Sequence, residues 1–156
     1  MKISTKGKYG LRAMIDLAQY SEQEAVSISS IAQRQKISES YLEQLVAKLK
    51  KAGLVVSIRG AAGGYRLARP AAGISVGDVL RALEGDVRAV ICTAQTEEGC
   101  EGEELCVTKY VWQRINESIE KTVDEMMLDQ LVAESRKAQE KAKNHDVDYS
   151  RNSCSG

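Results

Sequence analysis

The chain has 156 residues, enough for one domain with a hydrophobic core and a smaller appendage. The net charge is zero, yet residues 1–70 carry twelve Lys or Arg against five Asp or Glu, and residues 71–156 carry ten against seventeen. No stretch approaches the roughly 18 apolar residues of a membrane span, and the start MKISTKGKYG lacks the apolar centre of a signal peptide, so we expect a cytoplasmic protein with no membrane partner. Unless the charge split is chance, it indicates a polyanion-binding half joined to another unit.

Residues 5–20 are predicted to form the first helix. Its apolar face combines Leu11, Met14, Ile15 and Ala18 at helical spacing. Positive side chains, Lys8 among them, lie near its N-terminus, where the helix dipole favours anions. They face an external polyanion, or else they belong to a solvated surface.

Two further helices are expected before residue 53. Ser27 can cap a short helix that reaches about Gln35, and Ser38 can cap a third helix that runs to about Ala52. Gly53 supplies the left-handed residue that ends it. The buried stripe of the third helix is predicted to be Leu42, Leu45, Val46 and Leu49.

The opposite face of this third helix has the chemistry of a DNA-recognition helix. Gln44 can pair with adenine, and Glu43 can accept from the cytosine amino group but otherwise repels phosphate. Cations follow at Lys50 and Lys51, where they can meet the DNA backbone. The alternative for Glu43 is an ordinary exposed helix residue.

A β-wing is expected next. Residues 54–58 form a β-branched strand, residues 59–64 a glycine-rich turn, and residues 65–67 the return strand. The turn lacks the GKS or GKT ending of a phosphate-binding loop, and no helix follows it directly. Arg59 at the base of the wing could enter a minor groove, and Gly60 beside it could allow a close backbone approach.

Ser75 and Asp78 have the form of a capping box, which opens a fourth helix that ends near Glu84. Val76, Val79, Leu80 and Leu83 should form its core-facing stripe, packed against the first helix.

Three cysteines lie beyond this helix in a polar stretch: Cys92, Cys100 and Cys106, in the arrangement C-x7-C-x5-C. Buried structural cysteines normally have apolar neighbours, and these do not. The residues alone leave three interpretations open, namely a metal or Fe–S site, redox-active thiols, or incidental cysteines. The only histidine, His145, is distant in a polar tail.

A long helix is predicted from Leu105 to about Met126. Its apolar positions have the seam spacing of a coiled coil, and they are Trp112, Ile115, Ile119, Thr122 and Met126. A homodimer would bury this stripe, and the alternative is packing on the chain's own first domain. A last helix should span residues 129–143, followed by a disordered tail, residues 144–156, that contains Cys154.

The chain to about residue 135 resembles the IscR-type bacterial transcription regulators, whose sisters include CymR and NsrR. The resemblance rests on the runs STKGKYGLRAM, ISESYLEQLVAKLKKAGLV, RGAAGGYRLARP and ISVGDVLRALEG, and on the cysteine stretch ending CVTK. It implies a mainly α fold with a winged helix-turn-helix DNA-binding domain, a two-stranded wing and a long C-terminal dimerisation helix. The expected parts are residues 1–85 for DNA binding, 86–106 for sensing, 107–143 for dimerisation and 144–156 as the tail.

The resemblance also implies function. It predicts a homodimer that binds a double-stranded DNA operator and carries a [2Fe–2S] cluster on Cys92, Cys100 and Cys106, governing iron–sulfur cluster biogenesis genes. The family's DNA-contact positions fall on Ser40, Tyr41, Glu43, Gln44 and Arg59, and with them we expect contacts from Lys8, Ser38 and Gly60.

The sequence departs from the family at one point. Lys109 stands where close relatives have the histidine that is the fourth cluster ligand. Either another group supplies the fourth bond, for example one of the nearby glutamates Glu97, Glu98, Glu101, Glu103 and Glu104, or the cluster is unusually labile. For the whole protein, the alternatives are a DNA-binding regulator that senses zinc, thiol oxidation, nitric oxide or a sulfur-metabolism partner, or an Fe–S or redox carrier protein. No acid–base pair or activated nucleophile suggests an enzyme.

Overall fold

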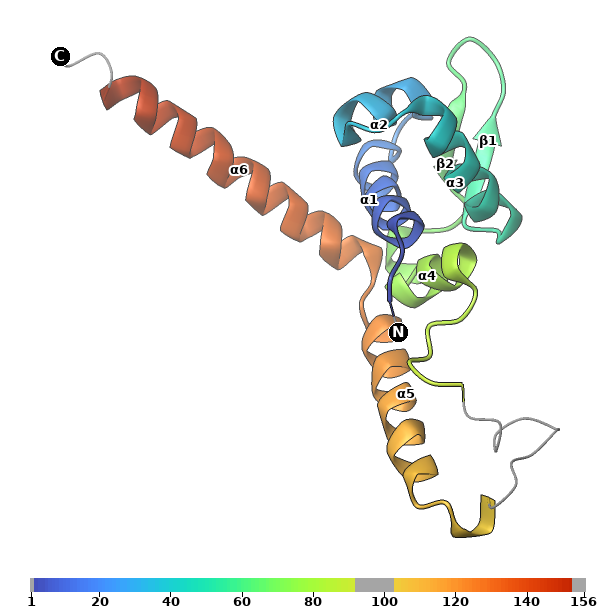
Figure 1. Ribbon diagram of the computed structural model, residues 1–156. Helices are drawn as coiled ribbons and strands as arrows, with labels where there is room; N and C mark the ends of the chain where they lie inside the picture. The colour runs from blue at the N-terminus through green and yellow to red at the C-terminus, as the bar shows by residue number, and fades with distance from the viewer. Residues whose placement is uncertain (1, 92–102, 153–156) are drawn as a thin grey trace.

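The computed structural model describes the backbone of residues 2–91 and 103–152 (Figure 1). The described part is mainly helical with one small antiparallel sheet, as the sequence predicts. Its elements are α1 (Thr5–Tyr20), α2 (Ile28–Gln35), α3 (Glu39–Lys51), β1 (Val55–Ile58), β2 (Gly64–Leu67), η1 (Ala71–Gly73), α4 (Val76–Glu84), η3 (Glu103–Leu105), α5 (Thr108–Glu125) and α6 (Leu128–Asn152).

The predicted caps set the starts of three helices. The hydroxyl oxygen of Ser27 accepts from the backbone N–H of Ser30, and that of Ser38 accepts from the N–H of Tyr41. Ser75 and Asp78 form a complete capping box at α4. Because a cap satisfies N–H groups that the helix itself leaves unpaired, these helices begin where the sequence predicts.

One core joins the first three helices, the wing and the start of α6. Met14 from α1, Leu42 from α3 and Leu128 from α6 each have no exposed surface. The predicted stripe of α3 is buried in full. Helix α4 covers the other side of α1, and Leu83 packs so closely against Gly10 that a Cβ there would overlap it.

The wing is a short hairpin in which Val55 pairs with Leu67 and Ile58 pairs with Gly64. An isolated bridge between Val26 and Tyr65 attaches β2 to the strand-like residue just before α2. The wing is therefore attached to the residues just before α2 as well as to α3.

Helices α5 and α6 extend away from this body in different directions (Figure 1). Their joint is attached to the start of α4, because the N–H of Leu128 donates to the carbonyl of Ile74 and the N–H of Val76 donates to that of Met126. Leu128 and Val132 bury the first turns of α6 against the core. None of the helices in residues 2–91 and 103–152 is long and apolar enough to cross a membrane.

The prediction of a disordered tail from residue 144 is wrong for residues 144–152, which continue α6 to Asn152. No glycine or proline occurs in residues 128–152 to interrupt the helix, and the good helix formers Ala, Glu, Lys, Gln and Arg are frequent in residues 128–143, from which it continues. The mostly polar composition of residues 144–156 predicts disorder, but a polar segment that continues an existing helix is equally compatible with it.

Candidate nucleic-acid interface and cysteine segment

The exposed side of α3 carries the predicted base-reading residues. Ser40, Glu43 and Gln44 are all exposed in the first two turns, while the apolar stripe faces the core. Ser38, the cap, is also exposed. The N-terminal half of α3 therefore presents a carboxylate and an amide to solvent, the kinds of group with which a recognition helix reads base edges.

The last turn of α3 is cationic, with Lys48, Lys50 and Lys51. The ammonium group of Lys50 donates to the hydroxyl of Ser57 on β1 at 2.9 Å. This bond connects the recognition helix to the wing. The cations lie in the turn that follows the predicted base-reading residues, and cationic side chains of this kind bind phosphates.

Tyr41 is half-buried, so it has a structural contact in addition to its predicted DNA contact. Its ring meets the edge of Tyr9 on α1 with 6.2 Å between centroids. The guanidinium of Arg12 lies 5.2 Å from the centre of the Tyr9 ring and also donates to Gln35. Lys8, beside Tyr9, is exposed. Sequence reasoning missed Tyr9 and Arg12 as residues that position α3, because their contacts cross between helices.

The wing turn is exposed at Arg59 and Gly60, the two predicted contacts. Gly60 has a φ of 112°, a conformation that favours glycine, and its carbonyl accepts from the N–H of Gly63 at 3.0 Å. The Gly60–Gly63 bond thus closes the turn directly after Arg59 and leaves the Arg59 side chain exposed at the end of β1.

A polar hollow of about 320 Å³ lies between the wing turn and the start of α2. Ser27 and Ser30 contribute hydroxyls from the helix side, and Ala62 and Gly63 line it from the wing. A helix N-terminus with hydroxyls favours a phosphate oxygen. The sequence indicated Ser27 only as a cap, since the Val26–Tyr65 bridge that brings the wing here has no local signal.

A buried ion pair holds α2 in place. The carboxylate of Asp16, whose side chain is 1% exposed, accepts two bonds from Arg34 (2.9 and 2.7 Å) and one from Gln35 at 2.9 Å. The hydrogen bond to Asp16 raises the pKa of Arg34, and the guanidinium lies 4.2 Å from the centre of the Tyr20 ring. The pair fixes the angle between α1 and α2, and hence the position of α3.

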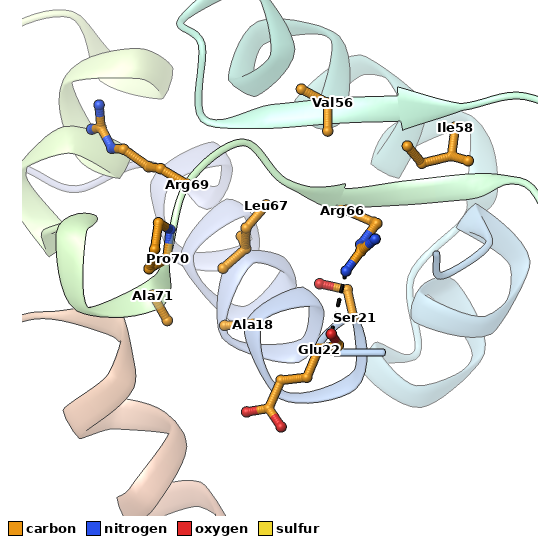
Figure 2. A pocket seen from close by; sticks show the side chains of 10 residues that line it. All are labelled: Ala18, Ser21, Glu22, Val56, Ile58, Arg66, Leu67, Arg69, Pro70 and Ala71. Atoms are coloured by element: carbon orange, nitrogen blue, oxygen red, sulfur yellow. Dashed lines mark hydrogen bonds between the residues drawn. The ribbon is translucent and has the colours of Figure 1, made fainter. Parts of the chain in front are cut away.

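A second groove, of about 460 Å³, lies behind the wing (Figure 2). Val56 and Ile58 border it from β1, and Leu67 points towards Ala18 of α1. Arg66 crosses the groove and donates to the backbone carbonyl of Glu22 at 3.2 Å. This bond attaches the second wing strand to the residues just after α1, so the residues that line the groove help to hold the wing in place.

Among the three predicted cluster ligands, Cys92 and Cys100 lie outside the described residues, as does Cys154. Cys106 is half-buried, and its Sγ lies 3.2 Å from the hydroxyl of Thr108. Hydrogen bonds from that hydroxyl and from the N–H of Lys109 lower the pKa of the Cys106 thiol. Since the thiolate is the form that binds metals, Cys106 suits the role predicted for it.

Lys109, which stands where the family has a histidine, bonds the Cys106 thiol through its backbone N–H. The ammonium group of Lys109 lies 5.4 Å from the centre of the Tyr110 ring. Within residues 2–91 and 103–152, side chains of His, Cys, Asp and Glu form no group of three that could hold a metal. Cys92 and Cys100, two of the three predicted ligands, lie outside these residues.

The predicted dimer stripe on α5 is exposed in part. Ile115 is 39% exposed and Met126 is 36% exposed, while Trp112 and Ile119 are half-buried. Val111 is 50% exposed on the same helix, and the sequence pattern missed it. A shallow groove of about 430 Å³ is lined by Val111, Arg114, Ile115, Ser118 and Ile119.

The three-helix body, its wing and the exposed face of α3 define a winged helix-turn-helix regulator that binds DNA. The chain belongs to the Rrf2 family, described as iron-dependent transcriptional regulators, which matches residues 3–134. The predicted resemblance to IscR-type regulators is confirmed. These relatives are transcriptional regulators rather than enzymes.

The relatives cover most of the chain. The HTH-type transcriptional regulator IscR of Yersinia enterocolitica is 42% identical over 132 residues, which are 85% of this chain and 79% of that protein. The solved structure of T. potens IscR has a TM-score of 0.71 and 46% identity, and covers 89% of this chain and 91% of its own. CymR, the global cysteine regulator of B. subtilis, has a TM-score of 0.70 and 41% identity, and covers 85% and 97%.

Proposed function

We propose that the chain acts as a homodimer whose choice of DNA operator is controlled by a [2Fe–2S] cluster on Cys92, Cys100 and Cys106, and that its targets are iron–sulfur cluster biogenesis genes. The observation that supports the cluster most directly is the similarity to IscR regulators, at 42% and 46% identity, in a chain that has three cysteines in the arrangement C-x7-C-x5-C. A cluster would link the three cysteines to one another, and this link would depend on iron supply and on redox state.

The chain's own residues divide the work. The cations of α3 and of the wing supply affinity through phosphate contacts, which carry no sequence information. Gln44 accepts or donates at a base edge, and Glu43 rejects sites that offer no donor to its carboxylate. The Cys106 thiolate lies two residues before α5, so a ligand bound there acts on the helix proposed to join two chains.

Lys109 limits the proposed ligand set. A protonated ammonium group cannot ligate iron, so the fourth bond comes from another group. The test is anaerobic reconstitution with iron and sulfide. A visible chromophore in the native protein, lost in Cys92→Ala, Cys100→Ala and Cys106→Ala, is the expected result. An unchanged spectrum in all three variants would exclude the cluster.

A second candidate keeps the DNA-binding function but replaces the cluster by zinc, thiol oxidation, nitric oxide or a sulfur-metabolism partner. Two observations favour it: Lys109 in place of histidine, and the similarity to a cysteine regulator. Metal and sulfide analysis of anaerobically purified protein separates the candidates. Zinc without sulfide would support the second.

DNA binding itself is measured by gel shift against genomic fragments at several salt concentrations. Specific complexes that weaken steeply with salt are expected, because neutralised phosphates release counterions. If the protein binds no fragment at any salt concentration, the DNA-binding function is excluded and an Fe–S or redox carrier protein is favoured instead.

A further inference from the structure

Among the described residues of α5, Asn116 is the one that is buried, with 5% of its surface exposed. Its side-chain oxygen accepts from the backbone N–H of Ala89 at 2.9 Å and of Val90 at 3.3 Å. Its NH₂ group donates to the carbonyl of Val90 at 2.8 Å. One side chain therefore holds three backbone groups of a segment that belongs to no helix or strand.

The segment it holds is the connection from α4 into the cysteine stretch. Val87 anchors this connection in a small apolar cluster with Val76 and Leu80. Asn116 anchors the connection a second time, at Ala89 and Val90. Ile91, the residue after Val90, is 63% exposed. The chain thus leaves the body directly after the residues that Asn116 binds.

The far end of the cysteine stretch begins the same helix. Cys106 lies two residues before Thr108, the first residue of α5, and Asn116 follows eight residues later. At a rise of about 1.5 Å per residue, the two ends are therefore attached at levels about 12 Å apart along one axis. A single rigid helix consequently sets how far apart the stretch must begin and end.

We propose that Asn116 is a positioning residue that fixes the entry of the cysteine segment on α5. A buried amide is costly unless it is hydrogen-bonded, and here the bonds go to backbone groups, so the clamp fixes the path of the chain. The consequence for a metal centre rests on the proposed function. The proposed consequence is that holding Ala89 and Val90 in place fixes the point from which the segment with Cys92 starts.

The test uses the full chain and two variants. Asn116→Asp keeps the shape and both accepting bonds but places an acceptor against the Val90 carbonyl, and Asn116→Ala removes all three bonds. Gln113→Ala is the matched control: Gln113 borders the same hollow as Asn116 and Arg88, but the bond that it loses, of 2.8 Å, goes to Glu117 on α5 itself and not to the connection.

Trypsin cleavage after Arg88 reports the clamp in cluster-free protein, because Arg88 directly precedes the bound residues. We expect both Asn116 variants to be cleaved there about tenfold faster or more, the size expected for a lost buried hydrogen bond, with cleavage in the DNA-binding domain unchanged. Alkylation of Cys92, followed by mass spectrometry, should accelerate likewise, while that of Cys106 stays constant. The Gln113 variant should match the native protein.

In anaerobically reconstituted protein, the clamp variants should lose the chromophore to a chelator faster than the native protein and the Gln113 variant. DNA affinity without the cluster should be the same for all four. Native rates at Arg88 and Cys92 in both clamp variants would overturn the inference, and so would faster cleavage with unaltered cluster loss, which would leave Asn116 a purely structural role. If native protein takes up no cluster, the proposed function fails while the Arg88 and Cys92 rates still decide the clamp.

Discussion

Glu43 is exposed in the second turn of α3, on the side opposite the buried stripe. Its carboxylate is repelled by phosphate, and it gains a favourable contact only where a base offers an amino group. It is therefore expected to lower binding to most sequences more than it raises binding to one. This is a role in selectivity rather than affinity.

Glu43→Ala should increase binding to non-preferred fragments by roughly tenfold, equivalent to about 1.4 kcal/mol, and change binding to the preferred operator less. Fluorescence anisotropy over a panel of operators measures the difference. Glu39→Ala removes the same charge from the first turn of α3 and should change all fragments by similar factors. An equal shift on every operator in Glu43→Ala would contradict the proposed role.

At this scale the sequence predicts residues whose partners are local. The caps Ser27, Ser38 and Ser75 could be predicted because each bonds a group three residues away. The bond from Arg34 to Asp16 and the clamp at Asn116 could not, because their partners are 18 and up to 27 residues distant in sequence. Burial of a polar residue depends on packing, which periodicity alone does not specify.

At the scale of elements, the end of α4 caps the start of α1. Glu84 accepts from the N–H groups of Ser4 and Gly7, both at 3.0 Å, and from the Ser4 hydroxyl. The Ser4 hydroxyl, with the N–H of Gly7, lowers the pKa of Glu84. A lowered folded pKa means stability that is present above the unfolded pKa and lost as pH falls through the folded value.

Glu84→Gln keeps the shape and removes the charge, so it should lower the free energy of unfolding by about 1 kcal/mol at pH 7. The gap between native and variant should narrow as pH falls below the ordinary glutamate pKa of about 4.3, where both side chains become neutral. Urea unfolding at several pH values measures it. Glu140→Gln, on the exposed surface of α6, should show no such gap, and a Glu84→Gln gap independent of pH would refute the charged cap.

The contact between α1 and α4 depends on a missing side chain. A Cβ at Gly10 would overlap Leu83, whereas a Cβ at Gly73 would have no described atom within 4 Å. Gly10→Ala should therefore lower the free energy of unfolding by about 1–3 kcal/mol, as overpacking does. Gly73→Ala should leave it nearly unchanged in thermal or urea unfolding, and equal stability of the two variants would show that Leu83 adapts freely.

The elements themselves were largely predictable. Helices α1 to α4 and the wing begin and end within a residue or two of their predicted bounds, because their apolar spacing and caps are strong local signals. The extent of α6 was not, since the sequence of its second half has no apolar spacing that predicts a helix. The attachment of its first half to α1 through Leu128 and Val132 required the tertiary structure.

At the scale of the molecule, the exposed apolar surface of α5 is the proposed contact between two chains. It is hydrophobic enough to associate and lies on a helix that extends from the body (Figure 1). Two recognition helices in one particle would bind two half-sites, so pairing multiplies the affinity of a single head.

Ile115→Glu should convert the dimer into monomers and reduce operator affinity by at least about tenfold, since binding of the second half-site no longer benefits from linkage. Sedimentation and gel shift measure the two effects. Gln113→Glu introduces the same charge on the opposite side of α5 and should remain dimeric. A monomeric native protein, or a dimeric Ile115→Glu protein with native affinity, would show that α5 does not join the chains.

The central proposal is that a cluster on the three cysteines controls which DNA operator the protein binds. The most direct measurement compares anaerobically reconstituted and cluster-free samples of the same native protein on the same operator panel. We predict a visible chromophore and a change in relative affinity between operators when the cluster is present, both lost in Cys92→Ala. Identical binding curves for the two samples on every operator would contradict the account.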